Sequence, residues 1–275
     1  MSDLQPDVSL FQSHRRNPWT RNALAISYLA IAASLMPQMI AASTPGAFDQ
    51  PLRKQIVNVG PPYYPAGARQ KKLSCYFYPH LVVKEYDEGQ KGAEWLAVVA
   101  SEKGAPPKCT LSHESGERVV DGSEWGGYFK GVKGNLVFFR AADGTDGGMP
   151  FAIYDSKTGK KIFEDSAYES WIWSVKPKNS PFNGLRVYKT ADGQITLKYL
   201  RVVGTDCDLH SEGVTCWEQV RANLQLKQTK MPVCSNYENI STRYSSSVAY
   251  PVETILIPEP VTKTTEGPIK CWPVD

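Results

Sequence analysis

Leu136-Val-Phe-Phe-Arg-Ala-Ala-Asp-Gly144 is an apolar run that an acidic residue and a glycine close. The same pattern occurs at Leu81-Val-Val-Lys-Glu-Tyr-Asp-Glu-Gly89 and at Leu185-Arg-Val-Tyr-Lys-Thr-Ala-Asp-Gly193. Short apolar or alternating runs that end in turns of Gly, Asp, Asn or Pro are typical of β-strands. The three segments therefore predict an all-β fold in which one strand and its turn recur along the chain.

The spacing of these segments indicates which all-β architecture to expect. They begin at residues 81, 136 and 185. The intervals between these starting residues are close to the period of about 40–50 residues of β-propeller blades. The stretch Ala152–Phe163 predicts a hairpin, because Gly159 suits a tight turn and Asp155 caps the turn backbone. We expect repeated β-hairpin or meander units in a propeller-like arrangement, with a β-sandwich as the alternative.

One short helix is predicted near residues 215–226. Thr215 and Glu218 have the spacing of a capping box, and apolar residues such as Trp217 and Val220 follow at helical intervals. This helix would begin next to a cysteine, so a disulfide there would tie its first turn to the preceding strand.

The N-terminal part of the chain predicts export. The run Ala23–Ala42 is apolar and about 20 residues long, the length that crosses a bilayer core. Three arginines precede it, which keeps the N-terminus in the cytoplasm and sends the rest outward. Residues 1–43 are therefore expected to be a signal peptide or a single N-terminal membrane anchor, residues 44–70 a linker, and residues 71–275 a disulfide-stabilised β domain.

Two outcomes of export stay open at this point. Small residues at Ala41-Ala42-Ser43 favour cleavage, whereas the apolar run is longer than the usual signal-peptide core. Cleavage predicts a periplasmic or secreted protein. Retention predicts an inner-membrane anchor with the β domain outside the cytoplasm.

The cysteines agree with export, because they are even in number and all follow the apolar run. No CxxC pair occurs, which argues against a redox site or a zinc knuckle. Six cysteines allow 15 pairings, and we predict the sequential one. The expected disulfides join Cys75 with Cys109, Cys207 with Cys216, and Cys234 with Cys271.

The charge excludes one class of partner. With 31 basic and 28 acidic residues, the net charge is only +3, so no field of one sign is present to bind a nucleic-acid backbone. Membrane contact is expected only through the N-terminal segment.

Three patterns contain residue types that occur in catalytic or metal sites. The segment His113–Glu117 resembles a zinc-protease motif but has Glu117 where the second histidine must stand, so a surface turn is expected. Residues 143–148 hold two aspartates but too few ligands for calcium, which favours a wide turn. Glu85 and Asp87 share a strand face and have the spacing of a glycosidase pair, although a solvated face explains them as well.

No nucleophile elbow, phosphate-binding loop or dinucleotide fingerprint occurs. We therefore expect no catalytic residues, cofactor or metal, and a protein that is not an enzyme.

Aromatic residues are the remaining candidates for binding. Trp125, Tyr128, Trp171 and Trp173 lie in turn-rich surroundings, where exposed rings stack on sugars or anchor a partner protein and buried rings form core. We expect an exported, non-enzymatic β-rich binding protein of the cell envelope, one form of which is an inhibitor or immunity-type partner of another protein. The alternative is a carbohydrate-binding or carbohydrate-active envelope protein, with an envelope polysaccharide as its partner.

Overall fold

The described part of the chain is built mainly of antiparallel strands. It includes one helix, α1 (Val214–Asn223). The all-β prediction is confirmed. The computed structural model describes residues 48–61, 70–101, 107–144, 146–168, 185–190, 192–235, 237, 245–257 and 259–274.

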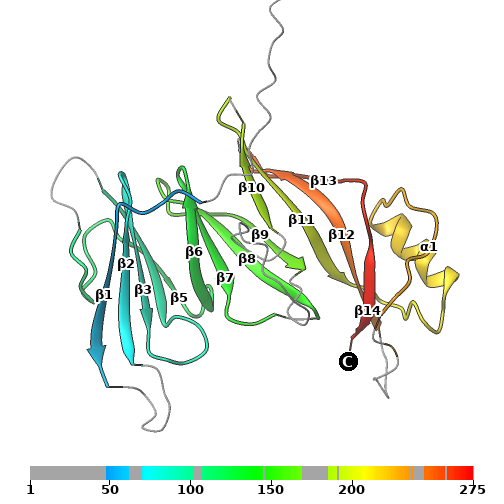
Figure 1. Cartoon of the computed structure of the whole chain (residues 1–275), viewed down its shortest axis with the longest axis horizontal. Helices are drawn as coiled ribbons and strands as arrows, with labels where there is room; N and C mark the ends of the chain where they lie inside the picture. Colours follow the sequence, from blue (N-terminus) through cyan, green and yellow to red (C-terminus); the bar gives the residue numbers. More distant parts are fainter. Residues whose placement is uncertain are drawn as a thin grey trace, which may run out of the picture. The chain divides into compact units, whose positions relative to one another are not determined.

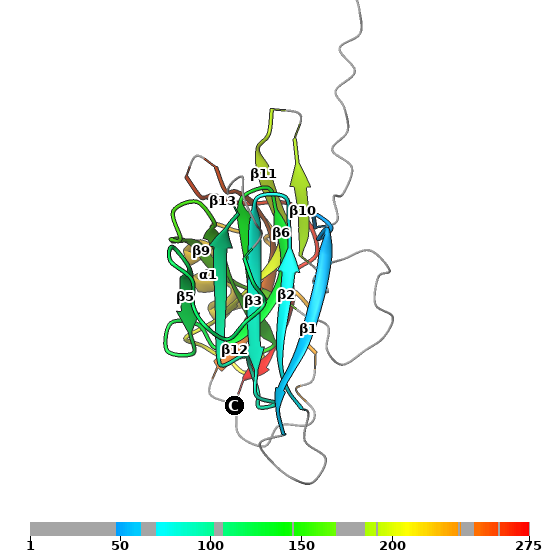
Figure 2. The same cartoon turned by 90° about the vertical axis from the view of Figure 1, so that its left-hand side faces the viewer.

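The first sheet is a five-stranded meander in the order β1-β2-β3-β4-β5 (Figure 1). Each strand pairs antiparallel with the next, and β1 forms one margin of the sheet (Figure 2). Its members are β1 (Arg53–Gly60), β2 (Lys71–Phe77), β3 (Leu81–Asp87), β4 (Trp95–Ala100) and β5 (Arg118–Asp121).

Strand β1 corrects the predicted domain boundary. It lies within residues 44–70, which we expected to be a linker. Val57 and Val59 alternate along the strand and pack against the apolar cluster around Leu73 and Cys75. The sheet therefore begins before residue 71.

The second sheet has nine strands. Its main path is β13-β12-β11-β9-β8-β7-β6, while β10 pairs with β11 and β14 with β12. Strands β9 and β11 share a single registered pair, Arg201 with Ala167, so the two halves of this sheet diverge there. Its members are β6 (Gly127–Lys133), β7 (Leu136–Ala141), β8 (Gly148–Asp155), β9 (Lys161–Tyr168), β10 (Arg186–Lys189), β11 (Ile195–Gly204), β12 (Ser245–Ile255), β13 (Val261–Thr264) and β14 (Lys270–Val274).

The apolar run of β7 is explained by burial on both faces. Val137 and Phe139 pack in a cluster with residues of the first sheet, whereas Leu136 and Phe138 pack in a second cluster with β10–β12 and α1. Successive side chains of a strand point to opposite faces. A strand covered on both sides is therefore apolar at consecutive positions.

The three aligned segments have the same position within their supersecondary structures. Each contains the first strand of an antiparallel hairpin: β3 with β4, β7 with β8, and β10 with β11. The hairpin predicted at 152–163 is confirmed as the turn between β8 and β9. Gly159 has φ 66°, and the Asp155 carboxylate accepts the backbone N–H groups of Lys157 and Thr158.

The predicted helix is confirmed, but its predicted cap is wrong. Helix α1 begins after Gly213, whose φ of 57° turns the chain into the helix, and its N-terminus has no side-chain cap hydrogen bond. Thr215 lies inside the first turn, so it cannot serve as the capping residue. Cys216 lies in that turn as expected.

All six cysteines are paired as predicted. Disulfides join Cys75 to Cys109, Cys207 to Cys216, and Cys234 to Cys271, with Cα–Cα distances of 5.8, 5.8 and 4.5 Å. Three disulfides indicate an oxidising environment, either the periplasm or the cell exterior.

The predicted leader, residues 1–43 with its apolar run, lies outside the described residues. In the part of the chain that the structure describes, no helix has the length and apolar character needed to span a bilayer.

Candidate interaction surface

The two faces of the five-stranded sheet have different neighbours. One face contributes Leu81, Val83 and Leu96 to the cluster that also holds residues of β6–β8. On the opposite face, which we call the outer face, Leu73, Cys75 and Val82 form a separate small cluster. This outer face is crossed by a strap, residues 107–117, that precedes β5.

A buried ion pair fixes the strap to the outer face. The Lys84 side chain has no exposed surface, and its Nζ lies 2.9 Å from Oε2 of Glu117, which is also fully buried. Lys84 also donates to the carbonyl of Ser112 at 3.3 Å. Cys75, the cross-strand neighbour of Lys84, is bonded to Cys109 of the strap. A disulfide and an ion pair therefore both fix the strap to the sheet.

Three donors surround the Glu117 carboxylate. Besides Lys84, it accepts the backbone N–H of Glu114 at 2.8 Å and lies 3.0 Å from Nδ1 of His113. Burial by itself raises the pKa of Glu117, but these hydrogen bonds and the charge of Lys84 hold the pKa below its usual value. Glu117 is thus buried inside the segment that we expected to be a surface turn, because it neutralises a buried lysine.

An aromatic row lies beside this pair, consisting of Tyr86, Trp95 and His113. The Trp95 ring lies 4.9 Å from the imidazole of His113 and 5.6 Å from the ring of Tyr86. The Tyr86 hydroxyl donates to Glu88 at 2.6 Å. Both aromatic rings are half-buried and the His113 side chain is 46% exposed. The row is therefore held by ring contacts and a hydrogen bond and still reaches solvent.

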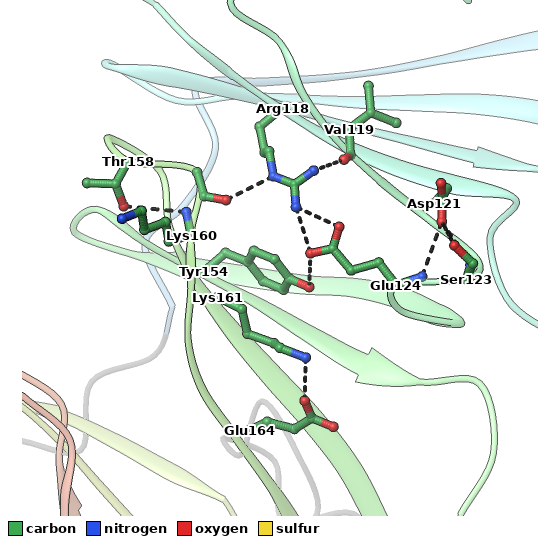
Figure 3. A network of polar contacts seen from close by, with 11 residues as sticks. Arg118, Val119, Asp121, Ser123, Glu124, Tyr154, Thr158, Lys160, Lys161 and Glu164 are labelled. Atoms are coloured by element: carbon green, nitrogen blue, oxygen red, sulfur yellow. Dashed lines mark hydrogen bonds and ion pairs between the residues drawn. The ribbon is translucent and has the colours of Figure 1, made fainter.

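The far end of the strap continues into a polar clamp (Figure 3). Arg118, directly after Glu117, forms an ion pair with Glu124 at 2.6 Å and donates to the carbonyl of Gly159 at 3.0 Å. The Tyr154 hydroxyl donates to Glu124 at 3.0 Å, and burial together with this carboxylate raises the pKa of Tyr154. The clamp ties β5 to the turn between β8 and β9.

The two predicted binding aromatics that the structure describes, Trp125 and Tyr128, do not form this surface. Trp125 is only 8% exposed and belongs to the core cluster, and its Nε1 has no hydrogen-bond partner in the described part of the chain. The Tyr128 hydroxyl accepts the backbone N–H of Gly92 at 2.8 Å, which uses it to hold a turn. Trp171 and Trp173 lie outside the described residues. The burial of Trp125 gives no support to a stacking role.

The carboxylates predicted on a solvated strand face are instead buried. Glu85 is 7% exposed and accepts the backbone N–H of Phe129 at 2.7 Å, while Asp87 pairs with Lys72 at 3.3 Å. Burial raises the pKa of Glu85, and the nearby charge of Asp87 adds to this. The solvated interpretation is wrong because this face of β3 points towards β6.

The acidic turn at residues 143–148 holds a side chain. Asp143 pairs with Lys91, and the carbonyl of Asp146 accepts the indole N–H of Trp272 at 2.9 Å. Gly147 has φ 79°, and a Cβ there would lie 2.7 Å from the Trp272 ring. The turn thus packs against Trp272 and accepts its hydrogen bond. Sequence reasoning did not single out this residue.

A cavity of about 300 Å³ lies elsewhere, between the end of α1 and the β13–β14 turn. Its charged pair, Lys227 and Glu266, is 3.8 Å apart and highly exposed. The cavity therefore lacks the buried polar anchor that the aromatic row and the strap possess.

No family model, curated protein sequence or solved structure matches this chain.

Proposed function

We propose that this chain is an exported, non-enzymatic β protein that binds another protein of the cell envelope through the aromatic row and the strap. The observation that carries the proposal is the partly exposed pair Tyr86 and Trp95, packed beside a loop that a disulfide and an ion pair anchor. Tyrosine and tryptophan dominate binding energy at protein interfaces, and anchors that are already ordered lose little entropy on binding. An inhibitor or immunity-type partner of a secreted protein is one form of this function.

Two further aspects belong to the same proposal. The leader at residues 1–43 delivers the β domain to the periplasm or the exterior, either cleaved or retained as an anchor. The three aligned hairpins derive from one duplicated unit, packed in the manner of propeller blades. The two-sided burial of β7 supports this packing.

Site-specific photo-crosslinking tests the binding partner. A photoreactive residue replaces Leu111, which is 41% exposed on the strap, and a control carries it at Val261, 50% exposed on β13. We expect one envelope protein to link at position 111 only, and to be lost when Trp95→Ala is added. Identical products at both positions, or products that Trp95→Ala leaves unchanged, contradict the proposal.

An envelope polysaccharide is the second candidate, favoured by two neighbouring rings with the Glu88 carboxylate and the His113 imidazole beside them. Sugars stack on such rings. If a polysaccharide quenches the tryptophan fluorescence of the parent protein but not of Trp95→Ala, while position 111 links no protein, then the ligand is carbohydrate.

A further inference from the structure

Strand β1 has an unpaired edge in the part of the chain that the structure describes. The edge of the second sheet at β6 is partly covered, because Asp49 bridges to Val132. Among the described strands, β1 pairs only with β2. Ile56, in the middle of the strand, is 55% exposed although it is a large apolar residue. Unpaired strand edges template the addition of another strand.

The hydrogen-bond alternation shows which residues of β1 present this edge. Tyr78 donates its backbone N–H to Leu81 at 2.8 Å, so even-numbered residues of β2 bond to β3 and odd-numbered ones to β1. In the observed register Arg53, Gln55 and Val57 face those odd-numbered partners, and the register shifts between Asn58 and Gly60. The backbone groups of Lys54, Ile56 and Asn58 are therefore directed away from the sheet.

The charges of β1 do not block this edge. A lysine on an edge strand normally prevents pairing by placing its charge where a new strand would lie. Here the guanidinium of Arg53 lies 4.0 Å from the centre of the Phe77 ring and the ammonium of Lys54 lies 4.8 Å from that of Tyr76. Both cations are folded back over β2.

We propose that β1 pairs antiparallel with β1 of a second copy of this chain, centred on Ile56 opposite Ile56 of that copy. In this register Lys54 faces Asn58 and Arg53 faces Val59, so every cation opposes a neutral residue. The two most exposed apolar strand side chains meet at the symmetry axis, as a self-complementary two-fold contact requires. The result is a continuous ten-stranded sheet.

Disulfide trapping tests this register. All six native cysteines are paired, so an introduced cysteine is the only thiol. Opposed residues of paired strands lie about 5.5 Å apart between Cα atoms, within disulfide range. For Ile56→Cys in the full chain we expect, after oxidation, at least about tenfold more linked dimer than for Gln55→Cys, whose copies lie beyond the ~7 Å limit.

Sedimentation of the full chain provides the second measurement. We expect a concentration-dependent rise in mass that Ile56→Lys abolishes, because it opposes two ammonium groups at the axis, and that Val261→Lys on the edge strand β13 leaves intact. Equal linking at positions 55 and 56 overturns the proposal, as does association that Ile56→Lys does not change. The latter result would assign the contact to another segment. Because the aromatic row is not part of this contact, the photo-crosslinking result at position 111 is independent of it.

Discussion

Substituting Glu117→Gln removes the buried counter-charge of the Lys84 ammonium, which has no exposed surface, and leaves only the partly exposed Glu114 carboxylate at 3.9 Å. Glutamine still accepts the Glu114 N–H through its carbonyl oxygen, so the loss arises mainly from the charge. Removing one partner of a buried ion pair costs about 3–5 kcal/mol, a large share of the roughly 5–15 kcal/mol of an ordinary domain. Urea unfolding of the oxidised protein at pH 7 measures this loss.

A double-mutant cycle isolates the pair. Lys84→Met leaves Glu117 with two of its donors, and the double variant Lys84→Met/Glu117→Gln has neither buried charge. We therefore expect the double variant to be less destabilised than the sum of the single variants, with a coupling of about 2 kcal/mol or more. A coupling below about 0.5 kcal/mol, as exposed pairs give, would refute the claim that the pair is buried beneath the strap.

The pH dependence provides an independent check. The folded-state pKa of Glu117 lies below its ordinary value of 4.5. A lowered pKa stabilises the fold fully above the unfolded-state value, and this stabilisation is lost as the pH falls through the folded-state value. The stability difference between the parent protein and Glu117→Gln should therefore narrow below pH 4.5. A difference that stays constant down to pH 3 would argue against this assignment.

Three further predictions concern the same fold. Replacing Cys75 and Cys109 with serine should cost about 3–4 kcal/mol and expose residues 107–117 to protease, and an unchanged urea midpoint would contradict the anchoring role of this disulfide. Glu85→Gln keeps the acceptor for the Phe129 N–H and removes a buried charge whose pKa is raised. It should therefore raise the thermal midpoint at pH 7, with the gain fading as the pH falls towards 4.5; a lowered midpoint would count against it. Gly147→Ala should be at least about 1 kcal/mol more destabilising than Gly193→Ala, because both have positive φ but only Gly147 lies against a ring, and equal losses would show that Trp272 is not seated there.

The strands and the disulfides were predictable from the sequence because they depend on local patterns. The run Leu136–Ala141 is apolar at successive positions since both of its faces are covered, and each cysteine pairs with its neighbour in sequence. Strand β1 was missed because its valines alternate with polar residues in a segment rich in proline. Its cover is a cluster on β2, which local pattern does not reveal.

The candidate surface was beyond sequence reasoning for a different reason. Lys84 and Glu85 are consecutive, point to opposite faces of β3, and are both buried. Their partners, Glu117 and the N–H of Phe129, come from segments distant in sequence. Tyr86 and Trp95 meet through strand register, and His113 joins them through the strap. An alternating polar pattern looks solvated until the covering segments are known.

The sequential pairing of the cysteines has a consequence for biogenesis. If the chain enters an oxidising compartment N-terminus first, each odd cysteine in order of appearance meets its native partner as the next thiol to arrive. Oxidation in order of emergence then yields the native set directly, without the reshuffling that takes seconds to hours. The last bond, from Cys234 to Cys271, closes only when β14 has arrived. Completion of this covalent framework therefore reports that the β domain has been delivered as far as β14.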